Sequence, residues 1–218
     1  MNSLRIQGRT ILFFVIILMQ SGHVMGQESK RIGIRAGLNL ANNIALSDGK
    51  RVDDDHSYRA ALHIGITSRF NLANKFSLNP EILYSKKGYK QESESVVIHY
   101  NYVNLPLLVG YNLGEKFTLQ TGPEFGYLIS AKMDSDGEQI DLIELYEAFD
   151  IDVKRLELGL TIASSYKLTD NLSIAVRYVH GISSVLKSGL PNTAGFYPNR
   201  KLSNLNRTFQ FSLAYLIW

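Results

Sequence analysis

The chain has 218 residues, with 23 Lys and Arg, 20 Asp and Glu, and no Cys. The lack of cysteine excludes disulfide bonds and a lipid-modified cysteine anchor. The charge is nearly balanced, and more so once a leader carrying two arginines is removed, so the composition excludes the strongly basic surface typical of nucleic-acid-binding proteins.

The first 26 residues have the three parts of a secretory signal peptide. Arg5 and Arg9 give a positive start, an apolar run follows at 11–19, and the small residue Gly26 ends the segment. We predict cleavage after Gly26, which leaves 27–218 as one outer-membrane barrel domain. The apolar run is too short to span a bilayer, which disfavours the alternative of a retained helical anchor.

Beyond the leader, apolar and polar residues alternate in long segments, the period of a β-strand with two different faces. In 117–130, for example, Leu119 and Phe125 fall on one face while Gln120 and Glu124 fall on the other. Strands of roughly a dozen residues exceed those of ordinary globular sheets and suit a tilted membrane crossing. The predicted strands are 31–41, 58–70, 76–87, 101–111, 117–130, 154–166, 172–181 and 206–218.

Short and long connections alternate between these strands. Short turns are predicted at 71–75, 112–115 and 167–171. Long polar loops are predicted at 43–57, 88–97, 131–152 and 182–205. Apolar residues near helical spacing in 139–149 allow a short surface helix within the third loop.

The alternation of connections is typical of an outer-membrane barrel with short periplasmic turns and long extracellular loops. We therefore predict an all-β fold, an eight-stranded antiparallel up-and-down transmembrane β-barrel in the bacterial outer membrane, with both termini in the periplasm. Closure is required because an open sheet edge in lipid would leave backbone groups unpaired. The expected surroundings of the barrel are outer-membrane lipid.

With the apolar face turned to lipid, the opposite face of the strands must fill the lumen. An eight-stranded barrel is only wide enough to hold side chains, so the charges on this face are expected to pair in a buried network, which excludes a wide diffusion pore. The predicted lumenal charges are Arg35, Arg59, Arg69, Glu81, Glu124, Glu157 and Arg177.

A soluble lipocalin-like barrel is the inverted alternative, with the apolar face inside and these charges outside. Aromatic residues near the strand ends favour the membrane interpretation, because Tyr and Phe gather at the two membrane interfaces of outer-membrane barrels. The tyrosines expected in these two girdles are Tyr84, Tyr111, Tyr127, Tyr166, Tyr178 and Tyr215.

No pattern in the chain predicts a catalytic, cofactor or metal site. The mature histidines have no metal-ligand spacing, and His63 is expected to be a hydrogen-bonded lumenal group. The run Asp53-Asp54-Asp55-His56 contains residue types that activate water, but it lies on a predicted polar loop, where a solvated role is favoured.

Two further stretches also favour structural roles. The acidic segment 134–138 lacks the full ligand set of a calcium loop and is expected to form a turn. The serine pairs Ser164-Ser165 and Ser183-Ser184 lack the context of a nucleophile elbow.

The chain resembles the PorT family of outer-membrane β-barrel proteins from Bacteroidetes-type bacteria. The resemblance rests on segments spread over the mature chain, of which LPLL at 105–108 and GPE at 122–124 are the more specific. The others are GIRAGLNLANN at 33–43, FSLNPEILYSKKGY at 76–89, the remainder of 102–130, VRYVHGISSV at 176–185 and the final FQFSLAYLIW. The resemblance implies an eight-stranded barrel and, from the namesake member, a part in protein secretion across the outer membrane; it implies no catalytic residues.

The favoured function is therefore a non-enzymatic integral barrel that has a structural role or binds a partner, such as another envelope or secretion protein. The alternative is a small outer-membrane hydrolase or protease that uses loop carboxylates such as Asp53 to Asp55. A pore is disfavoured by the small barrel size.

Overall fold

The computed structural model describes residues 31–48, 50–51, 55–72, 75–93, 95–135, 137–148, 153–184 and 202–217. The predicted signal peptide and its cleavage site lie outside these residues. None of the helices in the described ranges is both long and apolar enough to cross a membrane.

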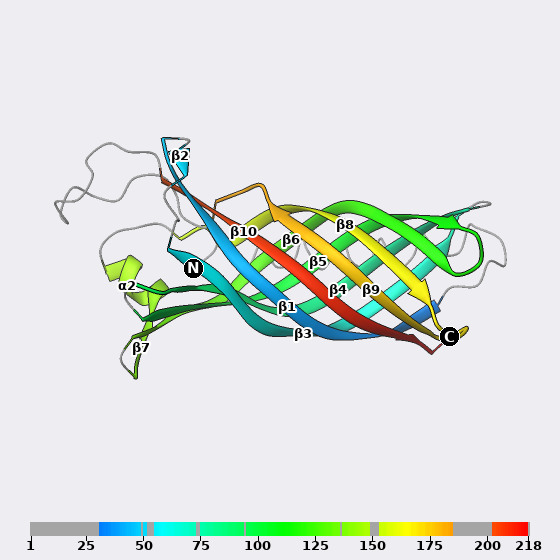
Figure 1. Ribbon diagram of the computed structural model, residues 1–218, viewed down its shortest axis with the longest axis horizontal. Helices are drawn as coiled ribbons and strands as arrows, with labels where there is room; N and C mark the ends of the chain where they lie inside the picture. Colours follow the sequence, from blue (N-terminus) through cyan, green and yellow to red (C-terminus); the bar gives the residue numbers. More distant parts are fainter. Residues whose placement is uncertain are drawn as a thin grey trace, which may run out of the picture.

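Eight long strands make up the body of the molecule. They are β1 (Arg31–Ser47), β3 (His56–Asn71), β4 (Phe76–Gln91), β5 (Val96–Leu113), β6 (Phe117–Ser135), β8 (Leu156–Lys167), β9 (Leu172–Gly181) and β10 (Leu202–Leu216). Three short elements, β2 (Lys50–Arg51), β7 (Glu138–Asp141) and the helix α2 (Leu142–Ala148), lie at one end of the barrel (Figure 1).

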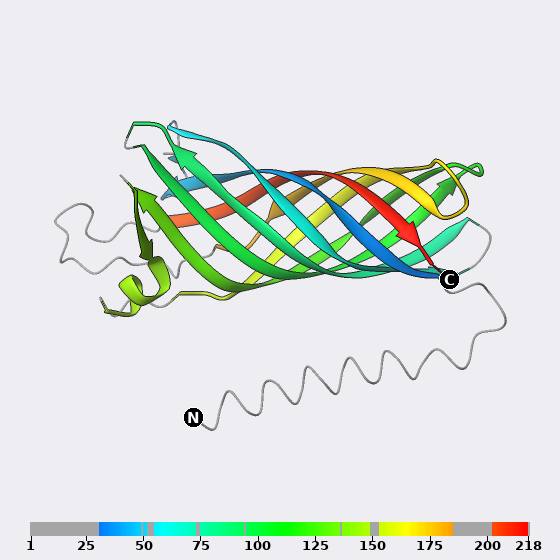
Figure 2. The same cartoon turned by 90° about the horizontal axis from the view of Figure 1, so that it is seen from below.

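The sheet closes on itself, because each long strand pairs antiparallel with the strands before and after it and β10 also pairs with β1. The closing register runs from Gly33 opposite Leu216 to Ser47 opposite Leu202. This closure confirms the predicted eight-stranded antiparallel up-and-down barrel. We call the end with the three short turns the turn end and the opposite end the loop end. Both ends of the described chain lie at the turn end (Figures 1 and 2).

The outer wall of the barrel is apolar over its middle zone. Ile34, Ile64, Ile82 and Ile162 are each more than half exposed although each belongs to a long paired strand. A water-soluble barrel would bury such side chains, so this surface suits lipid. Aromatic side chains are exposed near both borders of the zone, Tyr84, Tyr127 and Phe209 toward the loop end, and Phe76, Tyr111, Tyr166 and Tyr215 toward the turn end.

The strands continue well beyond the apolar zone at the loop end, which corrects three predicted loops. Residues 88–97, predicted as a loop, belong mostly to a ladder between β4 and β5 that ends in a tight turn. Strand β1 likewise continues to Ser47, and β6 continues to Ser135. The outer side of these extensions carries many polar residues, such as Lys86, Lys90 and Lys132, so the alternation that marked the lipid-facing strands fades while the backbone pairing continues.

An apolar cluster fills the inner side of this extension. Its buried members come from β4, β5, β6 and α2, namely Tyr89, Val96, Ile98, Tyr100, Tyr102, Leu128, Ala131, Leu142 and Ile143. The helix is the one that the spacing in 139–149 allowed. It begins after Asp141, whose carboxylate accepts hydrogen bonds from the backbone N–H groups of Ile143 (2.8 Å) and Glu144 (3.3 Å), as an N-cap does. Helix α2 lies at the loop end of the barrel (Figure 2), so this loop-end cluster closes the lumen at that end.

A substitution in the middle of the lipid-facing row tests this arrangement. Ile64 lies midway along the outward apolar positions of β3, so Ile64→Arg is expected to destabilise the folded protein in lipid vesicles by about 2–4 kcal/mol. Leu113→Arg, at the last residue of β5, is the matched control and is expected to cost about 0–1 kcal/mol because the arginine can reach the interface. Urea unfolding gives both values, and equal midpoints would contradict a lipid-facing Ile64.

Candidate functional site in the lumen and at the loop end

The inward face of the strands carries the polar residues of the alternation. Of the predicted lumenal charges, the structure buries five inside the barrel, Arg35, Glu81, Glu124, Glu157 and Arg177. They form two separate clusters at different heights in the lumen.

The arginine cluster lies toward the turn end and is centred on Glu81. Its Oε1 atom is 3.1 Å from Nε of Arg35 and 2.6 Å from Nη2 of Arg177, and it also accepts a hydrogen bond from the Thr67 hydroxyl at 3.0 Å. The other side of the Arg35 guanidinium donates to Ser212 at 2.9 Å. One buried carboxylate thus joins side chains from β1, β3, β4 and β9, which holds distant strands together across the lumen.

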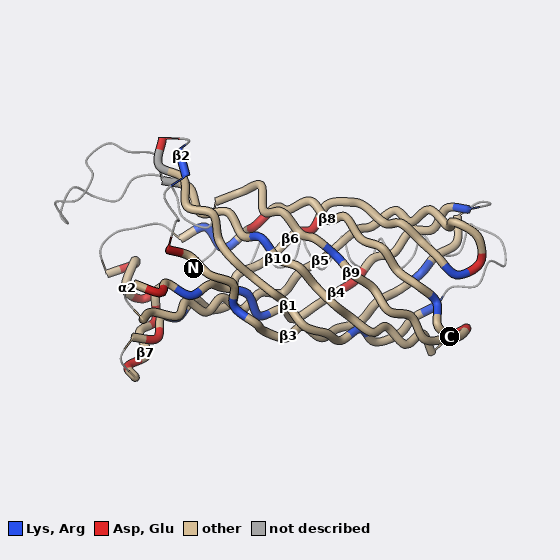
Figure 3. Tube along the Cα trace, in the orientation of Figure 1, with Lys and Arg blue, Asp and Glu red and all other residues tan. Residues whose placement is uncertain are grey.

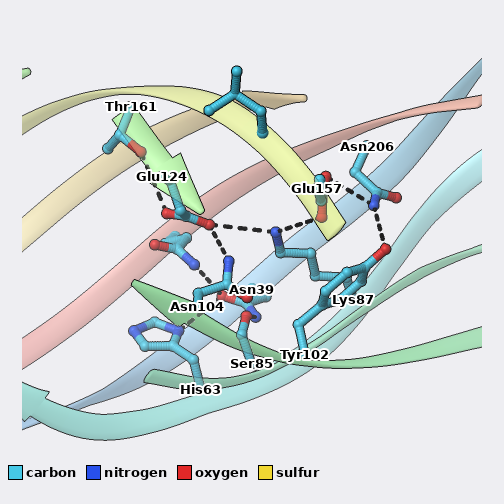
Figure 4. Close-up of polar contacts among 12 residues, drawn as sticks. Asn39, His63, Ser85, Lys87, Tyr102, Asn104, Glu124, Glu157, Thr161 and Asn206 are labelled. Atoms are coloured by element: carbon cyan, nitrogen blue, oxygen red, sulfur yellow. Dashed lines mark hydrogen bonds and ion pairs between the residues drawn. The ribbon is translucent and has the colours of Figure 1, made fainter. Parts of the chain in front are cut away.

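The lysine cluster lies toward the loop end and is centred on Lys87. Its ammonium nitrogen is 3.3 Å from Oε1 of Glu124 and 3.5 Å from Oε2 of Glu157 (Figure 4). It also lies 5.0 Å from the centre of the Tyr102 ring, close enough for a cation–π interaction. Lys87 is 1% exposed, so the ion pair is shielded from solvent.

Neutral side chains complete the coordination of the two carboxylates. Glu124 accepts hydrogen bonds from the amide of Asn104 and from the hydroxyl of Thr161, the latter at 3.3 Å. Glu157 accepts one from the amide of Asn206 at 3.0 Å. Carboxylates that accept several hydrogen bonds tolerate burial better than bare ones, because the bonds replace lost water.

A neutral polar layer separates the two clusters. Asn39 is its centre, donating to the hydroxyl of Ser85 at 2.9 Å and accepting from Gln210 at 3.1 Å. Its Oδ1 lies 2.8 Å from Nδ1 of His63, which is in the lumen and hydrogen-bonded, as its place in the alternation predicted. The lumen is therefore filled by side chains from end to end of this zone.

The charges of the two clusters are opposite and equal. Two arginines face one glutamate in the arginine cluster, while one lysine faces two glutamates in the lysine cluster. The six groups together are neutral, with a positive end toward the turns and a negative end toward the loops. Because a buried net charge is expensive, this balance is needed for a filled lumen.

Lys87 is the lumenal residue that sequence reasoning missed. Counting in twos from Glu81 along β4 puts Lys87 on the same inward face. The predicted strand 76–87 already placed Lys87 on this face, but the predicted set of lumenal charges did not include it. The other two predicted lumenal arginines lie outside both clusters. Arg59 donates to the carbonyl of Lys87 at 2.9 Å, and Arg69 donates to Asn112 at the turn end at 2.6 Å.

The loop carboxylates considered as catalytic candidates have structural contacts where they are described. Asp53 and Asp54 lie outside the described residues. Both oxygens of Asp55 are engaged by Ser93, one by its backbone N–H at 3.0 Å and the other by its hydroxyl. These hydrogen bonds lower the pKa of Asp55 below its usual value. The ring of the neighbouring His56 stacks on Tyr89 at 4.1 Å between ring centres.

The described residues of the acidic segment 134–138 belong to the hairpin between β6 and β7, where a turn was predicted. Asp134 contacts Nε2 of His99 at 2.8 Å and accepts from Gln139 at 2.9 Å, within the hairpin of β6 and β7. The hydroxyl of Ser183 accepts from the backbone N–H of Leu158 at 2.7 Å, and that of Ser184 accepts from Asn204 at 2.9 Å. These side chains fix backbone segments at the loop end.

The lysine cluster can be tested by removing its cation. Lys87→Met leaves two buried carboxylates facing each other without a partner, which should destabilise the protein by about 3–5 kcal/mol in urea unfolding. Lys90→Met, an exposed lysine of the same strand, is the control and should change stability little.

A rescue variant separates charge from packing. Adding Glu124→Gln and Glu157→Gln to Lys87→Met neutralises the whole cluster, so much of the lost stability should return. If the triple variant were as unstable as Lys87→Met alone, uncompensated charge would not be the cause.

Comparisons with known sequences and structures give structural neighbours of this barrel. No curated protein sequence matches the chain significantly. Among solved structures, the Neisserial surface protein A barrel has a TM-score of 0.51 at 12% identity, covering 86% of this chain and 99% of its own. Ail from Yersinia pestis, in complex with the heparin analogue sucrose octasulfate, gives 0.46 at 15% identity over 87% of this chain and 100% of its own. The OmpT protease from Escherichia coli gives 0.42 at 10% identity over 88% of this chain and 99% of its own.

A family model described as an outer membrane protein beta-barrel domain matches residues 25–187, which is most of the chain. The matched range contains seven of the eight long strands, and the eighth closes the barrel that they form. The chain therefore belongs to the family of outer membrane proteins with this β-barrel domain.

Proposed function

We propose that the protein is a non-enzymatic integral barrel of the outer membrane whose lumen is closed to diffusion and whose ends bind other envelope proteins. In this proposal the turn end and both termini face the periplasm, and the loop end faces the cell surface. The alternation of short turns and long strand extensions supports this orientation, because outer-membrane barrels keep their short turns in the periplasm.

The observation that carries the proposal is the filled lumen. Large ionic and polar side chains cross it at three heights, and the loop-end apolar cluster with α2 lies above them. A solute path would require breaking buried ion pairs and leaving their charges unpaired, which is costly. A barrel closed in this way serves as a scaffold or a receptor rather than as a channel.

The contacts of Asp55 support a non-enzymatic protein over the alternative of a hydrolase or protease. A general base works best with a pKa near the working pH and a free lone pair directed at its substrate. The pKa of Asp55 is instead lowered by hydrogen bonds to Ser93, and both of its oxygens are occupied by them. The carboxylate thus links the start of β3 to the turn between β4 and β5.

Resemblance to the PorT family supports a more specific role. Its namesake acts in protein secretion across the outer membrane, so we propose that this barrel supports a secretion complex through protein contacts at one or both ends. The motifs that carry the resemblance lie largely in the wall and lumen, including LPLL in β5 and GPE in β6. They support the same barrel framework, and the partner would be selected by the ends.

Conductance tests the closed lumen. The refolded full chain, inserted into planar lipid bilayers, is expected to give no steady conductance step on the nanosiemens scale, because side chains fill an eight-stranded barrel. A wide outer-membrane porin in the same bilayers is the positive control. Stable, reproducible steps of porin size from the purified protein would contradict a closed lumen.

Peptide hydrolysis tests the non-enzymatic assignment. The folded wild-type protein in detergent micelles is expected to cleave a fluorogenic peptide library no faster than buffer with micelles alone. The variant carrying Asp53→Asn, Asp54→Asn and Asp55→Asn should behave in the same way. Cleavage by the wild type that disappears in this variant would instead favour the hydrolase alternative.

A further inference from the structure

The lumen opens at the turn end into a cavity of about 730 Å³. It lies beyond the arginine cluster, and the short turns form its rim. Cations outnumber acids among its lining residues, which include Arg31, Arg35, Arg69, Lys116 and Lys167 against Glu115 and Asp170. Several blue segments and fewer red ones lie at this end of the trace (Figure 3). We call this cavity the turn-end vestibule.

Two arginines of the vestibule lie directly opposite each other on neighbouring strands. Arg31 of β1 and Arg69 of β3 are cross-strand partners, an arrangement in which like charges destabilise a sheet. Arg31 donates to the backbone carbonyl of Asp170 at 2.6 Å, and Arg69 donates to the amide oxygens of Asn71 and Asn112. Neither guanidinium forms an ion pair with a carboxylate of the described residues.

The acids at the rim do not cancel this charge. Asp170 already pairs with Lys167 at 3.2 Å, and Glu115 lies exposed in the turn between β5 and β6. The arginine cluster at the floor has a net positive charge that includes Arg35 of the lining, because Glu81 neutralises only one of its two arginines. The vestibule therefore carries a positive potential over a floor of the same sign, which suits an anionic ligand.

A buried acceptor in the same cavity points to a ligand that also donates hydrogen bonds. Gln120 lines the vestibule, is 7% exposed, and its Oε1 has no hydrogen-bond partner among the described residues. A buried acceptor left unpaired is costly, so a bound group that donates to it, once the Gln120 amide turns toward the vestibule, would relieve that cost. A simple phosphate or carboxylate satisfies the arginines, whereas a peptide adds backbone N–H donors.

We propose that the turn-end vestibule binds an acidic peptide segment of another envelope protein. Carboxylates of the segment are held by Arg31 and Arg69, whose planar guanidinium groups suit bidentate binding of carboxylates. A backbone N–H of the same segment donates to Gln120 deeper in the vestibule. The periplasmic location of this partner rests on the orientation given under the proposed function, while the binding itself does not.

Fluorescence anisotropy tests the proposal with the full chain folded in detergent micelles, where both ends are accessible. The probe is a short labelled peptide of alternating Glu and Gly. Arg31→Gln combined with Arg69→Gln should weaken its binding by about tenfold or more, because both charged donors are lost. Lys86→Gln combined with Lys90→Gln removes the same charge at exposed positions of the loop end and should leave the affinity unchanged. Equal effects of the two pairs would overturn the assigned site.

Two further arms define the ligand. A peptide of alternating Gln and Gly should not bind. Added salt should lower the affinity for the acidic peptide, because the attraction between the site and the peptide is electrostatic. Gln120→Leu should lower the affinity for the acidic peptide while leaving the affinity for inorganic phosphate unchanged. Phosphate that displaced the peptide at equal concentration would show a simple anion site and overturn the peptide assignment. Far-UV circular dichroism of each variant checks that the strands are intact.

A separate measurement keeps the two proposals apart. Maleimide labelling of Glu115→Cys in intact cells reports which side of the membrane the turn end faces, and the native chain has no cysteine to interfere. Protection in intact cells with labelling after permeabilisation supports the periplasmic orientation. Labelling of intact cells would overturn the proposed orientation and the periplasmic location of the partner. Binding of the acidic peptide to the protein in micelles would still decide whether the site exists.

Discussion

Backbone hydrogen bonding in a medium without water is the constraint on which this structure depends. Every N–H and C=O group in the lipid zone must find a partner within the protein, and a sheet can provide this only by closing. The ladder between β1 and β10 provides the closure. Once the sheet is closed, the two-residue period of each strand leaves every side chain either in lipid or in a narrow lumen.

The narrow lumen then dictates its own chemistry. Buried charges must balance, and the two clusters do so with opposite net charges on either side of the layer around Asn39. Glu81 and Lys87, six residues apart on β4, are the centres of the two clusters. A single strand therefore supplies the key group of each cluster, while the other partners come from strands around the barrel. These contacts give the barrel cross-links that the backbone ladder lacks.

The sequence was sufficient to predict the features that follow from the two-residue period. Strand number, antiparallel order and the outward apolar face were all predicted, because lipid requires a strict alternation that the chain displays plainly. The extensions of β4, β5 and β6 were missed, because beyond the lipid the outer face can be polar and the alternation loses its contrast. The predicted strand 76–87 placed Lys87 on the inward face as its last residue, and the burial of Lys87 follows from the continuation of β4 to Gln91. The hydrogen bonds between Asp55 and Ser93 join loops far apart in sequence.

The turn-end vestibule could not be predicted from the two-residue period, because it depends on the register between strands. Arg31 and Arg69 are 38 positions apart, and only the register of β1 against β3 makes them direct neighbours. The charges of these two arginines are not balanced by nearby acids, whereas the two lumenal clusters are neutral when taken together. Within one barrel, balanced charges fill the interior, and unbalanced charges remain at the end where a partner can reach them.

The central claim is that the apolar face of each strand contacts lipid and the polar face lines the lumen. Spin labels on β8 test it most directly. Because the native chain lacks cysteine, single-cysteine variants can carry a nitroxide at each position from Leu158 to Ala163 in lipid vesicles. Collision with lipid-soluble oxygen should be high at Leu158, Leu160 and Ile162 and low at the positions between them. The opposite phase, with Gly159, Thr161 and Ala163 exposed to oxygen, would contradict the account.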